Sequence, residues 1–118
     1  MSPETTANRA MLDELTERAD SACVLMREMA SPVRLAILCN LVSGEQSVGT
    51  IADLVGAKQP ATSQHLTRLH RRGLVARRRD GATVYYRIAD SRARAMLAAL
   101  HGLFCRDGEA KGPLMAAA

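Results

Sequence analysis

The sequence of 118 residues predicts a mainly α-helical domain that carries one small β-hairpin. Over most of the chain, apolar residues recur at steps of three and four, which is the spacing of one face of a helix. Between residues 75 and 88 the pattern changes to two short β-like runs on either side of Asp80-Gly81, a pair that favours a tight turn. Proline and glycine stand where helices would begin and end. Together these observations predict five helices and two strands.

The first helix is predicted to run through residue 29. Its apolar positions follow the alternating steps of a heptad seam, which packs against another helix; they are Leu12, Leu15, Ala19, Ala22, Met26 and Met29. Residues 1–9 are expected to form a flexible N-terminus and residues 106–118 a flexible tail, so that the domain spans residues 10–105.

The middle of the chain predicts three helices, over residues 31–42, 47–56 and 59–73. Ser31 and Ser47 can cap the first two, because a serine side chain accepts a hydrogen bond from a free backbone N–H. Proline follows directly at the start of the first and third helices, where no N–H is needed, and glycine closes the second and third. The side chains expected to face inward are Val48, Ile51, Leu54, Val55, Leu66 and Leu69.

Strands are predicted over residues 75–79 and 83–88, with Val84, Tyr86 and Ile88 on one face and Tyr85 and Arg87 on the other. A last helix follows Asp90 or Ser91, and its apolar stripe consists of Ala93, Met96, Leu97, Leu100, Leu103 and Phe104. Two short consecutive helices followed by a β-ribbon describe a winged helix-turn-helix.

The net charge of +4 is unevenly distributed. Residues 58–79 contain no acidic residue and hold Lys58, Arg68, Arg71, Arg72, Arg77, Arg78 and Arg79. Such a block repels itself unless it meets an anion, and the DNA backbone is the obvious one. A solvated basic face is the alternative explanation. Because the block falls on the second helix of the turn motif and on the wing, we favour duplex DNA as the partner.

In this fold the second helix of the motif enters the major groove and presents its N-terminal half to base edges. Gln64 can pair with adenine, Arg68 with guanine or phosphate, and His65 is expected to hydrogen-bond at the interface rather than bind a metal. The wing arginines are expected to contact phosphate or the minor groove. The full set of expected DNA contacts is Lys58, Gln59, Ala61, Thr62, Ser63, Gln64, His65, Arg68, Arg77, Arg78 and Arg79.

The apolar stripes of the first and last helices predict a homodimer, since one small monomer leaves too many such stripes uncovered. The two recognition helices would then lie about 34 Å apart, one turn of DNA. The alternative is that both stripes close the core of a monomer. A winged helix that binds protein is a further alternative, which a weak dependence of binding on salt would favour.

Composition excludes several other classes. With 47% apolar and 24% charged residues, the chain can form a packed core. The longest nearly apolar run, residues 95–105, is too short to cross a bilayer, and residues 1–30 lack a signal-peptide pattern, so we expect a cytoplasmic protein with no membrane partner. The three cysteines form no CxxC pair and are expected to be free thiols. No catalytic grouping or glycine-rich phosphate loop is visible, so we expect neither an enzyme nor a cofactor.

Four segments resemble the ArsR/SmtB family of winged-helix repressors: residues 30–35 (ASPVRL), 59–66 (QPATSQHL), 72–75 (RGLV) and 84–88 (VYYRI). The resemblance covers about residues 20–105. It implies a dimer that binds operator DNA, represses transcription and releases DNA when an inducer binds. The family's arsenic and lead site looks like a Cys-x-Cys, where this chain has Thr50 and Ala52. Its zinc site is also absent, since Arg92 and Leu103 stand at the histidine positions. We therefore expect no metal at those sites.

Cys39 and Cys105, with residues 47–49 and 103–105, resemble the thiol-switch branch of that family, typified by SqrR, BigR and HlyU. The resemblance implies that these two cysteines sense reactive sulfur species. On the residues alone, Cys39 is better explained as a core residue, since it shares a helical stripe with Leu35 and Leu38. Cys23 departs from the two-cysteine pattern and is expected to be a bystander. It keeps open an alternative, in which the same fold senses arsenite or another soft metal ion through cysteine thiolates.

Overall fold

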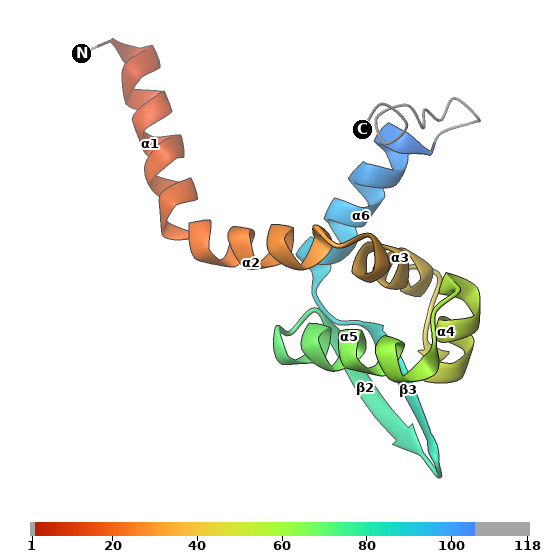
Figure 1. Cartoon of the computed structure of the whole chain (residues 1–118). Helices are drawn as coiled ribbons and strands as arrows, with labels where there is room; N and C mark the ends of the chain where they lie inside the picture. The colour runs from red at the N-terminus through yellow and green to blue at the C-terminus, as the bar shows by residue number, and fades with distance from the viewer. Residues whose placement is uncertain (1, 106–118) are drawn as a thin grey trace.

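The computed structural model describes residues 2–105, which form a winged helix-turn-helix with six helices and three strands (Figure 1). The prediction of five helices and two strands was therefore short by one of each. In chain order the elements are α1 (Pro3–Glu17), α2 (Ala19–Met29), α3 (Pro32–Leu41), β1 (Gln46–Ser47), α4 (Val48–Val55), α5 (Gln59–Arg71), β2 (Val75–Asp80), β3 (Thr83–Ile88) and α6 (Ser91–Phe104).

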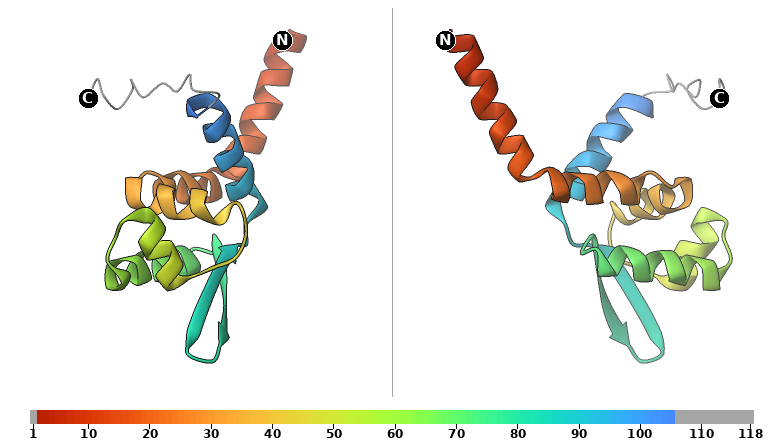
Figure 2. Two further views of the ribbon diagram at one scale, coloured as in Figure 1. Left: turned by 90° about the vertical axis from the view of Figure 1, so that its right-hand side faces the viewer. Right: turned by 60° about the vertical axis from the view of Figure 1, so that its left-hand side comes forward.

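The extra helix arises because the predicted first helix is broken at Arg18. The backbone of Arg18 leaves helical geometry (φ −111°, ψ 7°), and the chain changes direction there (Figure 2). Beyond the break, Leu25 and Met29 of α2 pack on the core, whereas α1 contains no buried residue. The apolar pattern continues unchanged across Arg18, so periodicity alone could not reveal the break. Residues 3–9, expected to form a flexible N-terminus, are the first turns of α1, which Ser2 caps.

The remaining helix boundaries follow the local signals in the sequence. Ser31 and Ser47 cap α3 and α4, each accepting from a backbone N–H three residues on, and Asp90 caps α6. Gly56 ends α4 in the left-handed conformation (φ 71°), where a side chain would be strained. These caps confirm the predicted helix starts at residues 31, 47 and 90.

The sheet has the order β1-β3-β2, with both pairs antiparallel. The expected hairpin is present, and Asp80 pairs with Thr83 across the turn. Its inner face buries Tyr86 and Ile88, as predicted. Strand β1 was missed because its two residues are too short to show a period, and it exists only through its pairing with β3.

The core lies where α3, α4, α5 and α6 meet the base of the sheet. Its fully buried apolar side chains are Ile37, Leu38, Leu41, Ile51, Leu66, Leu69 and Leu97. Leu54 was expected to face inward but is exposed, and Leu103 and Phe104 of the apolar stripe on the last helix are exposed as well. None of the described helices is long and apolar enough to span a membrane.

Leu66 anchors α5 to this core and is fully buried. Replacing Leu66 with alanine is expected to lower the free energy of unfolding by about 2–5 kcal/mol, since the cavity adds to the lost burial. The matched control is Leu54→Ala, at a leucine that is 62% exposed, where the change should stay within about 0.5 kcal/mol. Urea unfolding followed by circular dichroism, at equal protein concentrations, measures both. Equal losses in the two variants would contradict this placement of the core.

Candidate nucleic-acid interface

Helix α5 and the β2–β3 wing lie at the same end of the molecule, and the wing extends past α5 into solvent (Figure 1). A shallow groove runs between the N-terminal turn of α4, the first half of α5 and the tip of the wing. It is lined by Ser47, Val48, Gly49, Gln59, Ser63, Ala82, Thr83 and Val84. This surface therefore combines the start of α5 with the hairpin that follows it.

The first half of α5 exposes most of the side chains expected to contact DNA. Lys58, Gln59, Ala61 and Gln64 are exposed, and Ser63 and His65 are half-buried. No side chain caps the N-terminus of α5. Its free backbone N–H groups and the positive end of the helix dipole favour an anion such as phosphate.

Thr62 departs from the expectation that it faces DNA. It is fully buried, and its hydroxyl donates a hydrogen bond to the Lys58 carbonyl oxygen at 3.0 Å. The reason is helical geometry: Thr62, Leu66 and Leu69 follow steps of four and three, so they occupy one inward face. Thr62 is part of the core in this structure and is not presented to a groove.

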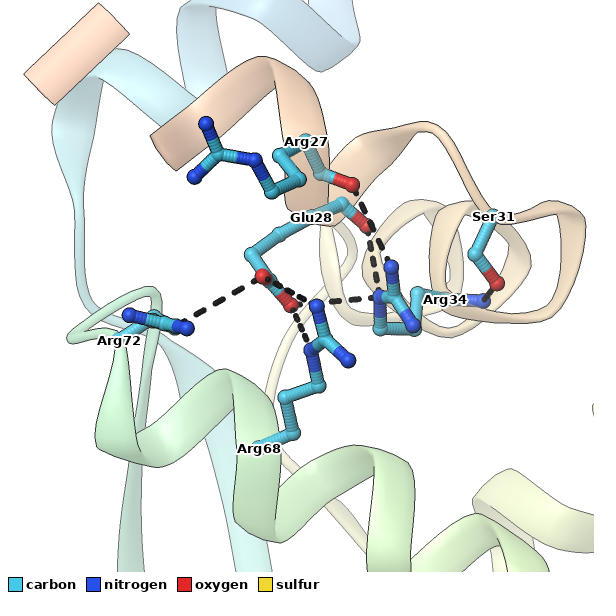
Figure 3. A network of polar contacts seen from close by, with 6 residues as sticks. All are labelled: Arg27, Glu28, Ser31, Arg34, Arg68 and Arg72. Carbon is cyan, nitrogen blue, oxygen red and sulfur yellow. Dashed lines mark hydrogen bonds and ion pairs between the residues drawn. The ribbon is translucent and has the colours of Figure 1, made fainter. Parts of the chain in front are cut away.

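Arg68 also lies elsewhere than expected. Its guanidinium faces α2 and makes a two-point contact with Glu28, with Nε to Oε1 at 2.7 Å and Nη2 to Oε2 at 3.1 Å (Figure 3). This hydrogen bond and the charge of Glu28 raise the pKa of Arg68. Arg68 thus joins two helices, and its guanidinium is held by a carboxylate and is not free to contact DNA.

The three wing arginines differ in their surroundings. The guanidinium of Arg78 donates to the Glu45 carboxylate at 2.8 Å and lies 4.5 Å from the centre of the Tyr85 ring, so this side chain is tied to the wing and to the loop before β1. Arg77 and Arg79 are exposed and lie on the same face of the wing as their cross-strand partners, Tyr86 and Val84. Among the described residues, neither makes an ion pair of the kind that holds Arg78. These two are therefore the wing arginines best placed to meet a phosphate.

The three thiols lie on α2, on α3 and just after α6, and all are exposed and unbridged. Cys39 lies on α3, and Cys105 follows the last residue of α6. Partial desolvation raises the pKa of Cys39, and the negative charge of the Cys105 thiolate raises it further. The two thiols are therefore close enough for their charges to interact. Arg94 of α6 also donates to the Val42 carbonyl oxygen at 2.9 Å, which ties α6 to the end of α3.

Within residues 2–105, no three cysteine, histidine or acidic side chains gather closely enough to hold a metal ion. Cys23 therefore does not join Cys39 and Cys105 in a three-thiolate cluster in this structure. Arg106, which we considered as a neighbour of Cys105, lies outside the described residues.

Glu28 and Glu45 were missed by the sequence reasoning, although both hold arginines of the basic block. The arginine partners lie 40 and 33 residues further along the chain. No local pattern connects residues so far apart. The sequence offered one signal for Glu28, which is its place beside the apolar Met29 at the end of an amphipathic helix. A glutamate buried at such a position needs a cationic partner.

Comparison with known proteins gives consistent results. A sequence model of bacterial regulatory proteins of the arsR family matches residues 31–77. The transcriptional activator HlyU of Vibrio cholerae is 40% identical over 95 residues, which cover 80% of this chain and 88% of HlyU.

Solved structures agree with the fold. Reduced HlyU from Vibrio cholerae has a TM-score of 0.75 at 40% identity, covering 79% of this chain and 98% of that chain. The transcriptional repressor BigR from Xylella fastidiosa has a TM-score of 0.76 at 35% identity, covering 80% and 97%. The homodimeric DNA-binding domain of Mb0332 from Mycobacterium bovis, a possible ArsR-family regulator, has a TM-score of 0.67 at 32% identity, covering 77% and 84%.

Proposed function

Because this chain belongs to the ArsR family of bacterial regulatory proteins, which are DNA-binding transcriptional regulators, we propose that it is a homodimeric repressor whose operator DNA is released when reactive sulfur species bridge Cys39 and Cys105. The observation that carries the proposal is the exposed polar and basic surface formed by α5 and the wing. This surface exposes Gln59, Gln64, Arg77 and Arg79 at one end of the molecule.

In the proposed complex, α5 lies in the major groove with Gln64 and Ala61 toward the base edges. Gln64 can pair with adenine, and Ala61 can contact a thymine methyl group. Ser63 and His65 are half-buried and serve as secondary contacts. Arg77 and Arg79 contact the backbone, which positions the protein without reading sequence.

The wing variant Arg77→Gln/Arg79→Gln is expected to bind duplex DNA more weakly and with a smaller dependence on salt. A dimer loses four phosphate contacts, so the slope of log K against log salt should fall by about 3.6. Fluorescence anisotropy between low and moderate salt measures it. The double variant Arg9→Gln/Arg27→Gln removes the same charge from exposed positions on α1 and α2, and its slope should stay nearer the wild-type value. Equal slopes for the two variants would rule out the wing as a phosphate-binding element.

The proposed dimer is supported by apolar side chains that the described chain leaves uncovered. On α1, Met11, Leu12 and Leu15 are 58–67% exposed, and on α6 Leu103 is 73% exposed. A helix with no buried residue gains little from its own hydrogen bonds in water, so α1 needs a packing partner. A second copy of the chain supplies one, as the homodimeric relative illustrates.

The proposed signal is a polysulfide, which acts as a two-electron oxidant. One cysteine thiolate attacks a sulfane sulfur and keeps a short sulfur chain, while a shorter polysulfide leaves. The second thiolate attacks that chain and expels sulfide, leaving the two cysteines joined through added sulfur. Such a bridge spans a gap that a direct disulfide cannot, since the latter needs Cα atoms within about 7 Å. Peptide mass spectrometry after polysulfide exposure tests the proposal: unmodified thiols, or modification of Cys23 alone, would refute it.

A further inference from the structure

We propose that Glu28 is a positioning residue for sequence-specific DNA binding, which holds the recognition helix α5 in its rotational setting against α2 and α3. The inference rests on the proposed DNA-binding function and adds a residue that lies outside the DNA-facing surface. We call Glu28 with its three arginines, Arg34, Arg68 and Arg72, the Glu28 cluster (Figure 3).

The Glu28 cluster joins three helices at one carboxylate. Glu28 comes from the end of α2 and is 1% exposed. Arg34, from the first turn of α3, brings its Nε to 3.3 Å from Oε1 and also donates to the backbone carbonyl oxygens of Glu28 and Arg27 at the end of α2. Arg68, in the last turn of α5, and Arg72, which directly follows α5, approach the same carboxylate at 2.7 and 3.7 Å.

Electrostatics keeps this carboxylate ionised despite its burial. Burial by itself raises the pKa of Glu28, but the hydrogen bond from Arg68 and the charges of Arg34, Arg68 and Arg72 outweigh it, so the pKa is lowered. Within the described residues, no buried polar side-chain atom lacks a hydrogen-bond partner. A buried ion pair is weak evidence for stability, but it can select one arrangement of packed helices over others.

The arrangement that the Glu28 cluster selects is the rotation of α5 about its own axis. Arg68 and Arg72 are four residues apart at the C-terminal end of α5, so two contacts with the same carboxylate fix how that end is rotated against α2. Gln64 and Ala61 continue the same side of the helix toward its N-terminus, where both are exposed. Each residue of a helix turns by about 100°. A small rotation of α5 therefore moves Gln64 and Ala61 away from the base edges while the basic surface as a whole stays in place.

When Glu28 is replaced, a purely electrostatic effect and a loss of positioning predict opposite changes in DNA affinity. Removing the negative charge of Glu28 makes the protein more basic and releases Arg68 and Arg72 from their ion pairs. This change by itself tightens binding to any DNA. Loss of positioning instead weakens binding to the correct sequence. The ratio of the affinity for the correct sequence to the affinity for unrelated DNA separates these effects.

The test uses a duplex that the wild-type protein selects from a randomised pool and a scrambled duplex of the same composition. Glu28→Gln is expected to lower the ratio of specific to scrambled affinity at least tenfold, with scrambled binding unchanged or tighter. Arg68→Lys keeps the charge but loses the two-point contact, and should lower the ratio to a similar degree. The double variant should lose no more than the worse single variant, because both act through one contact.

The control is Glu17→Gln, which removes an equal charge from an exposed position on α1 and should leave the ratio unchanged. If Glu28→Gln fails to fold by circular dichroism, Arg68→Lys decides the question, since Arg68 is half-exposed and keeps its charge. An unchanged ratio in Arg68→Lys, or equal losses on both duplexes, would overturn the inference. A wild-type protein that binds neither duplex would overturn the proposed function itself, and the inference with it.

Discussion

Replacing either Cys39 or Cys105 with serine is expected to leave operator binding at the wild-type level and to abolish its release by polysulfide. Both thiols are exposed and lie away from α5 and the wing, on α3 and after α6. Serine matches cysteine closely in size, so reduced protein should bind DNA unchanged. Without a second thiolate, however, the sulfur chain on the first cannot be closed into a bridge.

The free energy that this switch requires is small. A bridge between Cys39 and Cys105 would tie α3 to α6, and a hundredfold loss of DNA affinity needs only about 2.7 kcal/mol of coupling. Linkage then requires that bound DNA oppose bridging by the same factor. Fluorescence anisotropy with a labelled duplex, before and after polysulfide treatment, measures the release, and slower bridging in the presence of duplex would support the linkage.

The reaction should also depend on pH in a defined direction. The pKa of Cys39 is raised, so its thiolate is scarcer at neutral pH than that of an ordinary cysteine. The rate at which Cys39 is modified should therefore continue to rise at pH values where a free cysteine has already reached its plateau. Alkylation rates followed by mass spectrometry at several pH values measure this.

Cys23→Ser is the matched control, since this thiol lies on α2 and is also exposed. It should bind and release like the wild type. Release that persists in Cys39→Ser or Cys105→Ser would contradict the two-thiol mechanism. A titration in which arsenite releases the DNA and polysulfide does not would favour the soft-metal alternative.

The double variant Leu12→Gln/Leu15→Gln is expected to dissociate the dimer and with it tight operator binding. Both side chains lie on α1, at 58% and 60% exposure in the single chain. A dimer would bury four such leucines, each worth about 1.5 kcal/mol or more, so their loss weakens association by about 6 kcal/mol, or more than a thousandfold. A monomer contacts one half-site and loses the affinity that two linked recognition helices provide.

Sedimentation velocity measures the mass, and anisotropy on the same samples measures DNA binding. Leu54→Gln is the control, because Leu54 is equally exposed at 62% but lies on α4, away from α1 and α6. It should remain a dimer. A wild-type protein that is monomeric at micromolar concentration, or a double variant that remains dimeric, would contradict the proposed role of α1.

Much of the fold could be predicted because its signals are local. Ser31, Ser47 and Asp90 each cap a helix through a backbone N–H two or three residues away. The hairpin turn consists of Gly81 and Ala82, one residue later than the Asp80-Gly81 pair predicted. Apolar spacing likewise identified the core residues Leu66, Leu69 and Leu97. The family resemblance, carried by contiguous segments, was confirmed by relatives that span most of the chain.

The remaining features depend on partners that are distant in sequence. β1 forms only because Gln46 pairs with Tyr86, and the bend at Arg18 follows from packing that α2 has and α1 lacks. The direction of Arg68 could not be read from α5, because Glu28 is 40 residues away. Thr62 was expected to contact DNA because its hydroxyl is polar, but it lies on the inward face of α5 and is buried.

By itself, then, the sequence determined the order of the helices, the hairpin and the basic block, since caps, turns and periodicity act over a few residues. Only the tertiary structure decided which of the basic residues are free to meet DNA. A guanidinium pairs with a suitable carboxylate that is close in space, and the burial of Glu28 strengthens its contact with Arg68. Glu28 and Glu45 therefore hold Arg68 and Arg78, while Arg77 and Arg79 point to solvent.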